Sequence, residues 1–206
     1  MISNKKNFLV VALKKWNHDN FKKIKKKKFF LIKNKKDLTF LKIKKINPQY
    51  IFFPHWSYKI KTDIINNYTC IGFHESDLPY GRGGSPVQNL ILRNKVKTKI
   101  TAFIMNNSLD EGDVVMKKNL SLRGSAQEIF ERSSNIIFKM INVITKNKKL
   151  AFTRQKGKAY YFKRLKNNAL ITSKDLSING LYNKIRMLDA DSYERAHLII
   201  KKKLKI

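Results

Sequence analysis

The sequence has 206 residues, of which 42% are hydrophobic, enough for one domain with a substantial core. This composition excludes a disordered, low-complexity or collagen-like chain. The formal net charge is +31, and a charge of this size taken alone indicates a nucleic acid or an anionic membrane as partner.

The positive charge is unevenly distributed along the chain. Residues 1–62 carry a net charge of +16 and residues 136–206 one of +14, whereas residues 63–135 carry +1. Lys accounts for 37 of the cations and Arg for only 8, although Arg is the residue that grips phosphates and guanine edges in pairs. We therefore do not expect a nucleic-acid partner, and we look for chemistry in the middle segment, where acidic residues are retained.

Cysteine content and hydropathy bound the environment of the protein. The single cysteine, Cys70, excludes an internal disulfide and a multi-cysteine zinc site, so we expect no metal and a reducing, cytoplasmic location. The apolar run Phe8–Leu13 is too short for a secretory signal and has no cleavage site after it. No stretch approaches the ~18 apolar residues of a membrane span, so we expect no membrane partner.

Short apolar runs alternate with polar, helix-like segments through the first half of the chain. The runs are Phe8–Ala12, Phe29–Ile32, Tyr50–Phe53 and Thr69–Phe73. Runs rich in β-branched and aromatic residues predict buried strands, and helices between them predict βαβ units with a parallel sheet. Asp37 is the expected cap of the helix before the third strand.

The second half predicts two further strands, at Lys99–Met105 and Val114–Met116. Ser125 and Glu128 form a capping box, which opens a helix whose apolar residues follow the 3.6-residue period. After this helix, Ala151–Tyr161 predicts a strand pair with a Lys-Gly turn.

A final helix through Leu188 completes the predicted elements. Together they predict the α/β class. We expect a Rossmann-like domain with a mostly parallel sheet over residues 1–150, followed by a C-terminal strand pair and helix over residues 151–206.

The most informative stretch is Gly72–Pro86, which runs from the end of a predicted strand to a predicted helix start. His74 lies at the carboxyl end of its strand, where ligands bind in open α/β sheets. The glycines that follow allow the backbone to turn and approach a ligand closely. Ser85 is the expected helix cap, with Pro86 at the first helical position, and the free amides there could hold an anion.

A second stretch, Asn106–Asp113, is an acidic loop between two predicted strands. Gly112 permits a tight bend, so Asp110 can face His74 from a neighbouring strand end. A histidine with a carboxylate partner is a general acid–base pair. We expect the nearby Glu75 and Asp113 to be solvated or capping groups.

Taken in order, His74, Leu78–Pro79, Arg82–Gly83, Ser85–Pro86 and Leu109–Gly112 resemble the signature of the formyltransferases that use 10-formyltetrahydrofolate. The Asp-Leu-Pro-Tyr-Gly-Arg-Gly-Gly-Ser-Pro form is most similar to the sugar N-formyltransferases of nonulosonate (pseudaminic-acid type) pathways. The resemblance covers most of the chain and is specific between about Ile51 and Gly124.

The resemblance implies transfer of a formyl group from 10-formyltetrahydrofolate to the amine of a nucleotide-linked amino-deoxy sugar. His74 would stabilise the developing oxyanion, and Asp110 would orient His74 and help to take the proton of the amine. The implied contacts to the folate come from Phe53, His55, Trp56, Ser57, Met105 and Ser108. The implied contacts to the sugar substrate come from Arg82, Gly83, Gly84 and Ser85. From its residues alone, Arg82 could equally brace its loop through hydrogen bonds to carbonyl groups.

One position departs from the family signature. The family places Asn two residues before the histidine, to share the oxyanion, and this sequence has Gly72 there. A backbone amide, a water or another side chain would have to supply the second donor. Alternatively, the protein is impaired or binds without catalysing.

Three alternatives stay open. The methionyl-tRNA enzymes share this core and suit the net charge, but they carry a larger C-terminal domain than the residues after Lys149 would form. Glycinamide ribonucleotide formyltransferases fit the length but lack the Arg-Gly-Gly-Ser-Pro form. A basic nucleic-acid-binding protein is the alternative from a different class. The late strand pair is also a candidate contact for a homodimer.

Overall fold

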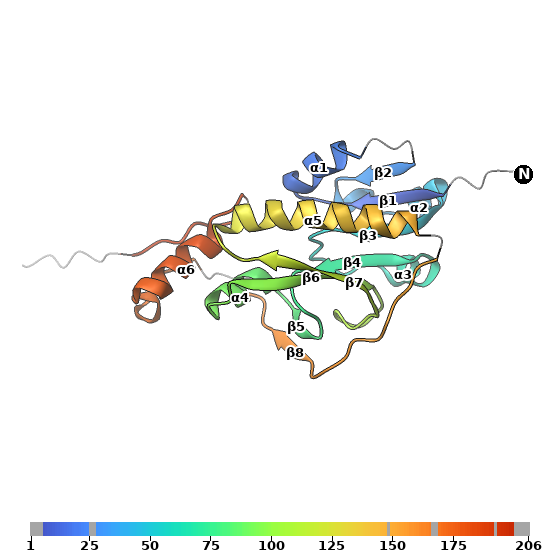
Figure 1. The fold of residues 1–206 in the computed structure, drawn as a ribbon. Helices are drawn as coiled ribbons and strands as arrows, with labels where there is room; N and C mark the ends of the chain where they lie inside the picture. The colour runs from blue at the N-terminus through green and yellow to red at the C-terminus, as the bar shows by residue number, and fades with distance from the viewer. Residues whose placement is uncertain (1–5, 25–27, 148, 166–168, 192, 200–206) are drawn as a thin grey trace, which may run out of the picture.

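The computed structural model describes residues 6–24, 28–147, 149–165, 169–191 and 193–199 (Figure 1). In the first half, the elements are β1 (Asn7–Val11), α1 (Lys15–Lys22), β2 (Phe29–Ile32), η1 (Lys35–Asp37), α2 (Phe40–Ile46), β3 (Pro48–Phe53), α3 (Thr62–Asn67) and β4 (Cys70–His74). They are followed by β5 (Tyr80–Gly83), α4 (Pro86–Leu92), β6 (Lys97–Ile104), β7 (Val114–Ser121), α5 (Ala126–Lys146), β8 (Tyr160–Phe162), η2 (Ser173–Asp175) and α6 (Ile178–Leu188).

Six strands form one sheet in the order β2-β1-β3-β4-β6-β7. The four strands β2, β1, β3 and β4 pair in parallel, and helices connect them, so the predicted α/β fold is confirmed. Strand β6 is antiparallel to both β4 and β7. Phe53 pairs with Gly72, which brings the carboxyl ends of β3 and β4 side by side.

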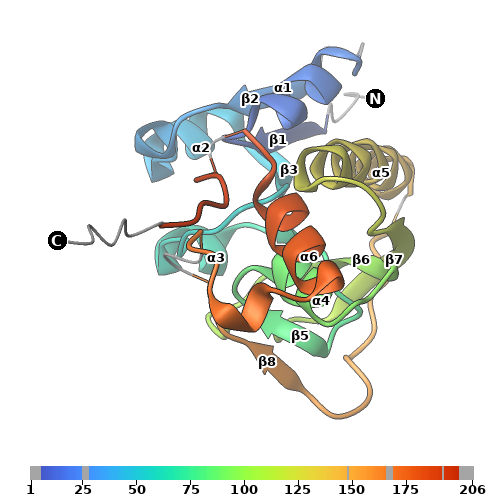
Figure 2. The same cartoon turned by 90° about the vertical axis from the view of Figure 1, so that its left-hand side faces the viewer.

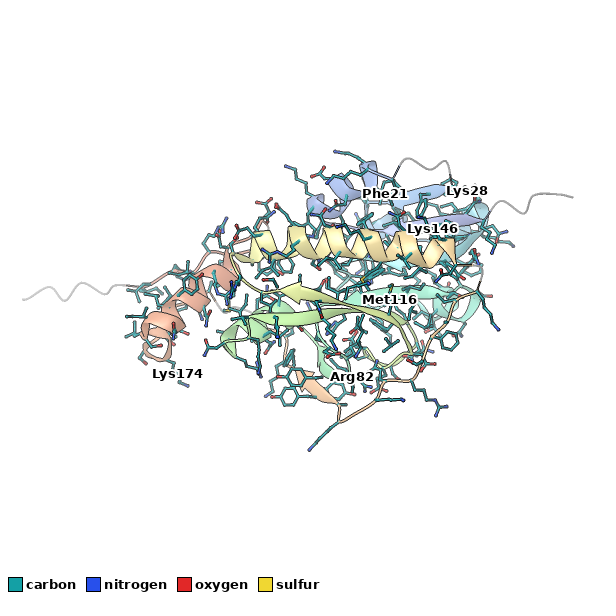
Figure 3. All side chains as sticks on the ribbon, viewed as in Figure 1. Phe21, Lys28, Arg82, Met116, Lys146 and Lys174 are labelled. Atoms are coloured by element: carbon teal, nitrogen blue, oxygen red, sulfur yellow. The ribbon has the colours of Figure 1, made fainter. Side chains whose placement is uncertain are left out.

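Helices cover both faces of the sheet (Figure 2). On one face, apolar side chains of α1, α4, α5 and α6 join a core that includes Trp16, Val87 and Ile137. On the other face, Ile43 of α2 and Ile64 of α3 pack against the strands. Lysines lie at the periphery of this core, where Lys28, Lys146 and Lys174 are exposed (Figure 3).

Three helix caps were predicted from the sequence. The structure confirms the cap of α5 and differs at the starts of α2 and α4. The capping box of Ser125 and Glu128 is present at the start of α5, as predicted. Asp37 does not cap α2, because it lies in the preceding 3₁₀ turn and the Thr39 side chain accepts the capping hydrogen bond. Ser85 precedes α4 with a left-handed backbone and does not cap it; its Oγ accepts a hydrogen bond from the distant Leu165 N at 3.2 Å.

The predicted strand pair within Ala151–Tyr161 is wrong. Thr153 forms an isolated bridge with Val114, and β8 pairs in parallel with β5. Aromatic packing explains this choice, since the Tyr160 ring stacks on the Tyr80 ring at 5.4 Å between centroids. The division of the chain at residue 150 stays a prediction. Both β8 and α6, which follow residue 150, pack on elements that precede it.

Two other expectations meet the structure directly. Cys70 is a buried strand residue, and burial raises the pKa of its thiol to about 12, so it is chemically inert near neutral pH. Within the described part of the chain, no helix is both long and apolar enough to cross a membrane.

Candidate active site

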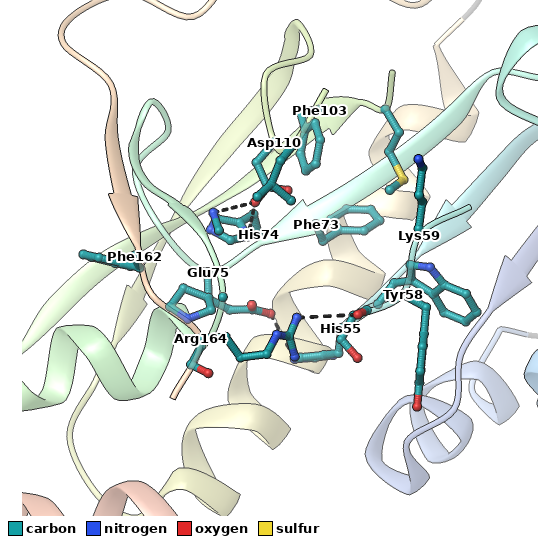
Figure 4. A pocket seen from close by; sticks show the side chains of 18 of the residues that line it. His55, Tyr58, Lys59, Phe73, His74, Glu75, Phe103, Asp110, Phe162 and Arg164 are labelled. Carbon is teal, nitrogen blue, oxygen red and sulfur yellow. Dashed lines mark hydrogen bonds and ion pairs between the residues drawn. The ribbon is translucent and has the colours of Figure 1, made fainter. Parts of the chain in front are cut away.

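The carboxyl ends of β3 and β4 open into a cavity of about 850 Å³ (Figure 4). Because the two strands are parallel neighbours, the residues that follow them meet there: His55 after β3, and His74 with Glu75 at the end of β4. This edge is where open α/β sheets bind ligands, and the volume lies in the range of small-molecule sites.

His74 is 7% exposed and bonded through one ring nitrogen. Its Nε2 lies 2.6 Å from the carbonyl oxygen of Gly81, which can only accept, so Nε2 carries a proton. Its Nδ1 faces Oδ2 of Asp110 at 3.7 Å, which is too long for a hydrogen bond. In its neutral form, His74 presents a lone pair at Nδ1 beside the Asp110 carboxyl group, and an amine beside the two can donate one N–H to each.

Asp110 reaches His74 from a hairpin loop between β6 and β7. The hairpin turns beside the start of β4, where Met105 N donates to the carbonyl oxygen of Cys70 at 2.8 Å. Asp110 has a left-handed backbone, with φ of 54°, and its Oδ2 accepts a hydrogen bond from Gly83 N at 2.8 Å. Thus the loop folds from the far end of β4 toward its carboxyl end.

Two residues other than Asp110 hold this loop in its conformation, namely Gly112 and Gln155. A Cβ at Gly112 would collide with the carbonyl oxygen of Ile104, so only glycine fits the turn. The side-chain amide of Gln155 donates to the carbonyl oxygens of Asp110 and Gly112, both at 2.8 Å. The position of the Asp110 carboxylate therefore depends on a residue 45 positions further along the chain.

Arg82 braces the same loop from the other side. Its Nη1 donates to Glu111 Oε1 at 2.8 Å, and its Nε and Nη2 donate to Gln155 Oε1 at 3.1 and 2.9 Å. Nη1 also donates to the hydroxyl of Tyr161 at 3.0 Å. The Arg82 side chain is therefore engaged by the side chains of Glu111, Gln155 and Tyr161, and its contact to the substrate stays a prediction.

A second histidine–carboxylate pair lies in the same cavity wall. His55 Nε2 is 3.2 Å from Glu75 Oε1, and both side chains are buried, at 6% and 8% exposure. His55 Nδ1 contacts Asn17 Oδ1 at 3.1 Å, and Asn17 Oδ1 accepts from Ser134 Oγ at 2.8 Å. Ser133 Oγ donates to Glu75 Oε1 at 3.3 Å.

Aromatic rings enclose this second pair. Trp16 and Phe130 stack with 5.2 Å between ring centroids, and the His55 ring meets both edge-on. Burial lowers the pKa of His55; the Glu75 carboxylate opposes that shift, and Lys14 adds to it. His55 is therefore neutral near pH 7.

Most of the residues predicted from the sequence line the cavity: His55, Trp56, Ser57, His74, Gly83, Gly84, Ser85, Met105, Ser108 and Asp110. Phe53 and Arg82 do not. Phe53 is fully buried in the core under the α2 and α3 face, because alternate residues of β3 point to opposite sides of the sheet.

Several lining residues were not predicted, among them Lys14, Trp16, Glu75, Arg164 and Tyr193. They come from segments that only the folded chain brings together. The position of Glu75 directly after His74, at a strand end, could have indicated a site residue. An isolated acidic residue is more often solvated, and the sequence therefore predicted a solvated or capping group.

Known proteins resemble this chain in sequence and in structure. The Formyl transferase family profile matches residues 1–132. The chain belongs to the formyl transferase family. A solved methionyl-tRNA formyltransferase from Clostridium thermocellum is 44% identical, with a TM-score of 0.89, over 95% of this chain and 88% of that one. Methionyl-tRNA formyltransferase of Sulfurimonas denitrificans is 31% identical over 100 residues.

The match to the Sulfurimonas formyl transferase covers 48% of this chain and 33% of that protein, so the chain spans about a third of the length of this curated relative. An N-formyltransferase from Helicobacter canadensis, solved in complex with folinic acid and dTDP-3-aminofucose, shares the fold at a TM-score of 0.63 and 16% identity. The structural match covers 88% of this chain and 80% of the Helicobacter chain. The sugar enzymes are thus more distant than the sequence resemblance implied.

Proposed function

We propose that this formyl transferase family member transfers a formyl group from 10-formyltetrahydrofolate to the amine of a phosphate-bearing acceptor. The observation that carries the proposal is the pair of His74 Nδ1 and Asp110 Oδ2, 3.7 Å apart, in the wall of a cavity of about 850 Å³. Membership of the family supports the reaction class.

The cavity suits a folate at the end formed by Trp56, Met105 and the loop up to Asp110. Trp56 offers an apolar ring there, and its buried Nε1 has no hydrogen-bond partner among the described residues. When bound, the folate would supply an activated formyl group. The Helicobacter enzyme, solved with folinic acid, supports this choice of donor.

Asp110 and His74 would act on the acceptor amine. An amine that lies beside the pair, within hydrogen-bond distance of both, can donate one N–H to Asp110 Oδ2 and another to His74 Nδ1, and loss of its proton to this pair makes it nucleophilic. Once His74 holds that proton, it is a cation, and it stabilises negative charge that develops on the formyl oxygen. When the adduct collapses, the bond between the formyl carbon and the folate nitrogen breaks, and the proton held by His74 can pass to that leaving nitrogen. The Gly81 carbonyl keeps the ring in place throughout, through Nε2.

The first candidate acceptor is methionyl-tRNA. The identity to the Clostridium enzyme favours it, as does the net charge of +31, because positive charge attracts a polyanion. A nucleotide-linked amino sugar is the second candidate. The Asp-Leu-Pro-Tyr-Gly-Arg-Gly-Gly-Ser-Pro form of residues 77–86 favours it, and its diphosphate would also suit a basic cavity rim.

One assay tests the reaction and separates the acceptors. The protein is incubated with 10-formyltetrahydrofolate and either methionyl-tRNA or a panel of nucleotide-linked amino sugars, and formylation is measured by mass spectrometry. We expect a formyl mass gain on one acceptor class. If tRNA is the acceptor, KM should rise steeply with salt, since each phosphate contact releases counterions. No gain on any acceptor would refute the proposal.

A further inference from the structure

The Glu75 carboxyl group is buried in the cavity wall and makes few hydrogen bonds within the protein. The residue is 6% exposed. Oε1 lies 3.2 Å from His55 Nε2, but His55 Nε2 has no hydrogen-bond partner among the described residues, so this contact is not a hydrogen bond. Ser133 Oγ donates to the same oxygen at 3.3 Å. Among the described residues, no hydrogen bond to Oε2 is formed.

A buried carboxylate in this state favours a ligand that donates hydrogen bonds. Desolvation of a carboxylate costs several kcal/mol unless donors replace the lost water, on the order of the penalties for other buried ions. Here Trp16 and Phe130 exclude water from one side. The hydrogen bonds that Glu75 lacks within the protein can come from a molecule in the cavity, which Glu75 lines (Figure 4).

Glu75 lies close enough to His74 to contact the same acceptor. His74 and Glu75 are consecutive residues, so their Cα atoms are about 3.8 Å apart, and both side chains line the same cavity. If the amine lies at His74, as proposed above, Glu75 faces another part of the same bound molecule.

The surrounding charges favour a neutral donor over a second ammonium. Lys14 lines the same cavity, with Nζ 5.6 Å from the Trp16 ring centroid, and Arg164 lines it from the other side. These cations repel a further positive group, and they suit the phosphate of the acceptor. A hydroxyl group meets no such repulsion, and a carboxylate accepts strongly from it.

We infer that Glu75, positioned by His55 and Ser133, binds a hydroxyl group of the acceptor at a distance from the amine that is formylated of up to about six bonds. This inference rests on the proposed function and extends it from the reacting pair to acceptor specificity. Both candidate acceptors carry such a group. It is the free hydroxyl of the terminal ribose in methionyl-tRNA, and the ring hydroxyl beside the amine in an amino sugar.

The test combines a charge-removing variant with acceptors that lack the hydroxyl. Glu75→Gln keeps the shape of the side chain, and Glu131→Gln makes the same change on an exposed carboxylate of α5, outside this cavity. Each protein is assayed with the normal acceptor and with its deoxy analogue. We expect Glu75→Gln to lower kcat/KM for the normal acceptor by about tenfold or more, mainly through KM, because a buried hydrogen bond to a charged group is lost.

For the wild type and for Glu131→Gln, kcat/KM should be about tenfold lower with the deoxy acceptor than with the normal one. For Glu75→Gln, the two acceptors should give the same kcat/KM. If Glu75 had a purely structural role, Glu75→Gln would lower kcat/KM for both acceptors by the same factor. It would also shift the melting temperature or the affinity for tetrahydrofolate. Ser133→Ala, which loosens the positioning of Glu75, should give a smaller loss of the same kind. Equal kcat/KM of wild type and Glu75→Gln overturns the inference.

Acceptor binding by calorimetry separates this inference from the proposed function. An acceptor that binds the wild type without being formylated refutes the proposed reaction. In that case, weaker binding by Glu75→Gln supports the hydroxyl contact and equal binding overturns it. Failure of both acceptors to bind the wild type overturns the reaction and the inference together.

Discussion

The ring of Phe103 fills the space above Gly72. A Cβ built at Gly72 would lie 2.8 and 2.9 Å from two ring atoms of Phe103, and 3.1 Å from Cγ of Met105. Gly72 and Phe103 are paired residues of β4 and β6, and Phe103 is 4% exposed, so the ring cannot easily withdraw. This is the position at which the family signature has an amide side chain, and β6 has packed into it.

Gly72→Asn should therefore destabilise the protein rather than restore a donor. Overpacking of a buried site costs about 1–3 kcal/mol, since backbone or side chains must shift. Urea denaturation of Gly72→Asn should show this loss, and the double variant Gly72→Asn/Phe103→Ala should recover part of it relative to the sum of the two single variants. Strict additivity of the two changes would show that Phe103 is not the obstacle.

His74→Ala and Asp110→Asn should each lower kcat by about a hundredfold or more, because the first removes the proton acceptor and the second its charged partner. Steady-state formyl transfer measures the loss. Asp113→Asn is the matched control in the same loop, as its contact with Ile104 uses only the backbone. Near-normal turnover by both site variants would show that the pair is not catalytic.

Gly112→Ala should lower activity without touching a reacting group. The added methyl group collides with the carbonyl oxygen of Ile104, so the loop must move and carry Asp110 away from His74. A displacement of about 1 Å in a catalytic group can cost on the order of a hundredfold in rate. Gly157→Ala is the comparison, since nothing lies within 4 Å of the added atom and the backbone strain from its positive φ of 102° falls outside the loop that carries Asp110. Similar activities of the two variants would contradict the role of Gly112.

Stability should fall with acidification through the usual pKa of histidine. The pKa of His55 lies below its ordinary value of 6.5, because burial disfavours the charged ring. Below pH 6.5 the unfolded chain binds a proton that the folded chain does not, so the free energy of unfolding falls until the folded-state pKa is passed. Urea midpoints between pH 7.5 and 5 should fall less in His55→Gln than in the wild type. A steeper fall in the variant would contradict this assignment.

Local residue patterns predicted most of the elements and the proposed reacting pair. Apolar runs separated by short helices predicted the parallel half of the sheet, because a strand buried on both faces must be apolar along its length. The capping box of Ser125 and Glu128 marked the start of α5 for a similarly local reason. His74 and Asp110 were found because each follows a strand in a recognisable order of residues.

Tertiary structure decided what surrounds that pair. Only pairing with β5 placed β8, since its partner lies about 80 residues earlier in the chain. Glu75 reads as a surface acid in the sequence. It is buried because His55 and Ser133, from segments before and after it, close around it. Burial and partner geometry depend on contacts between distant segments, and these contacts set the charge state and the free hydrogen bonds of a side chain.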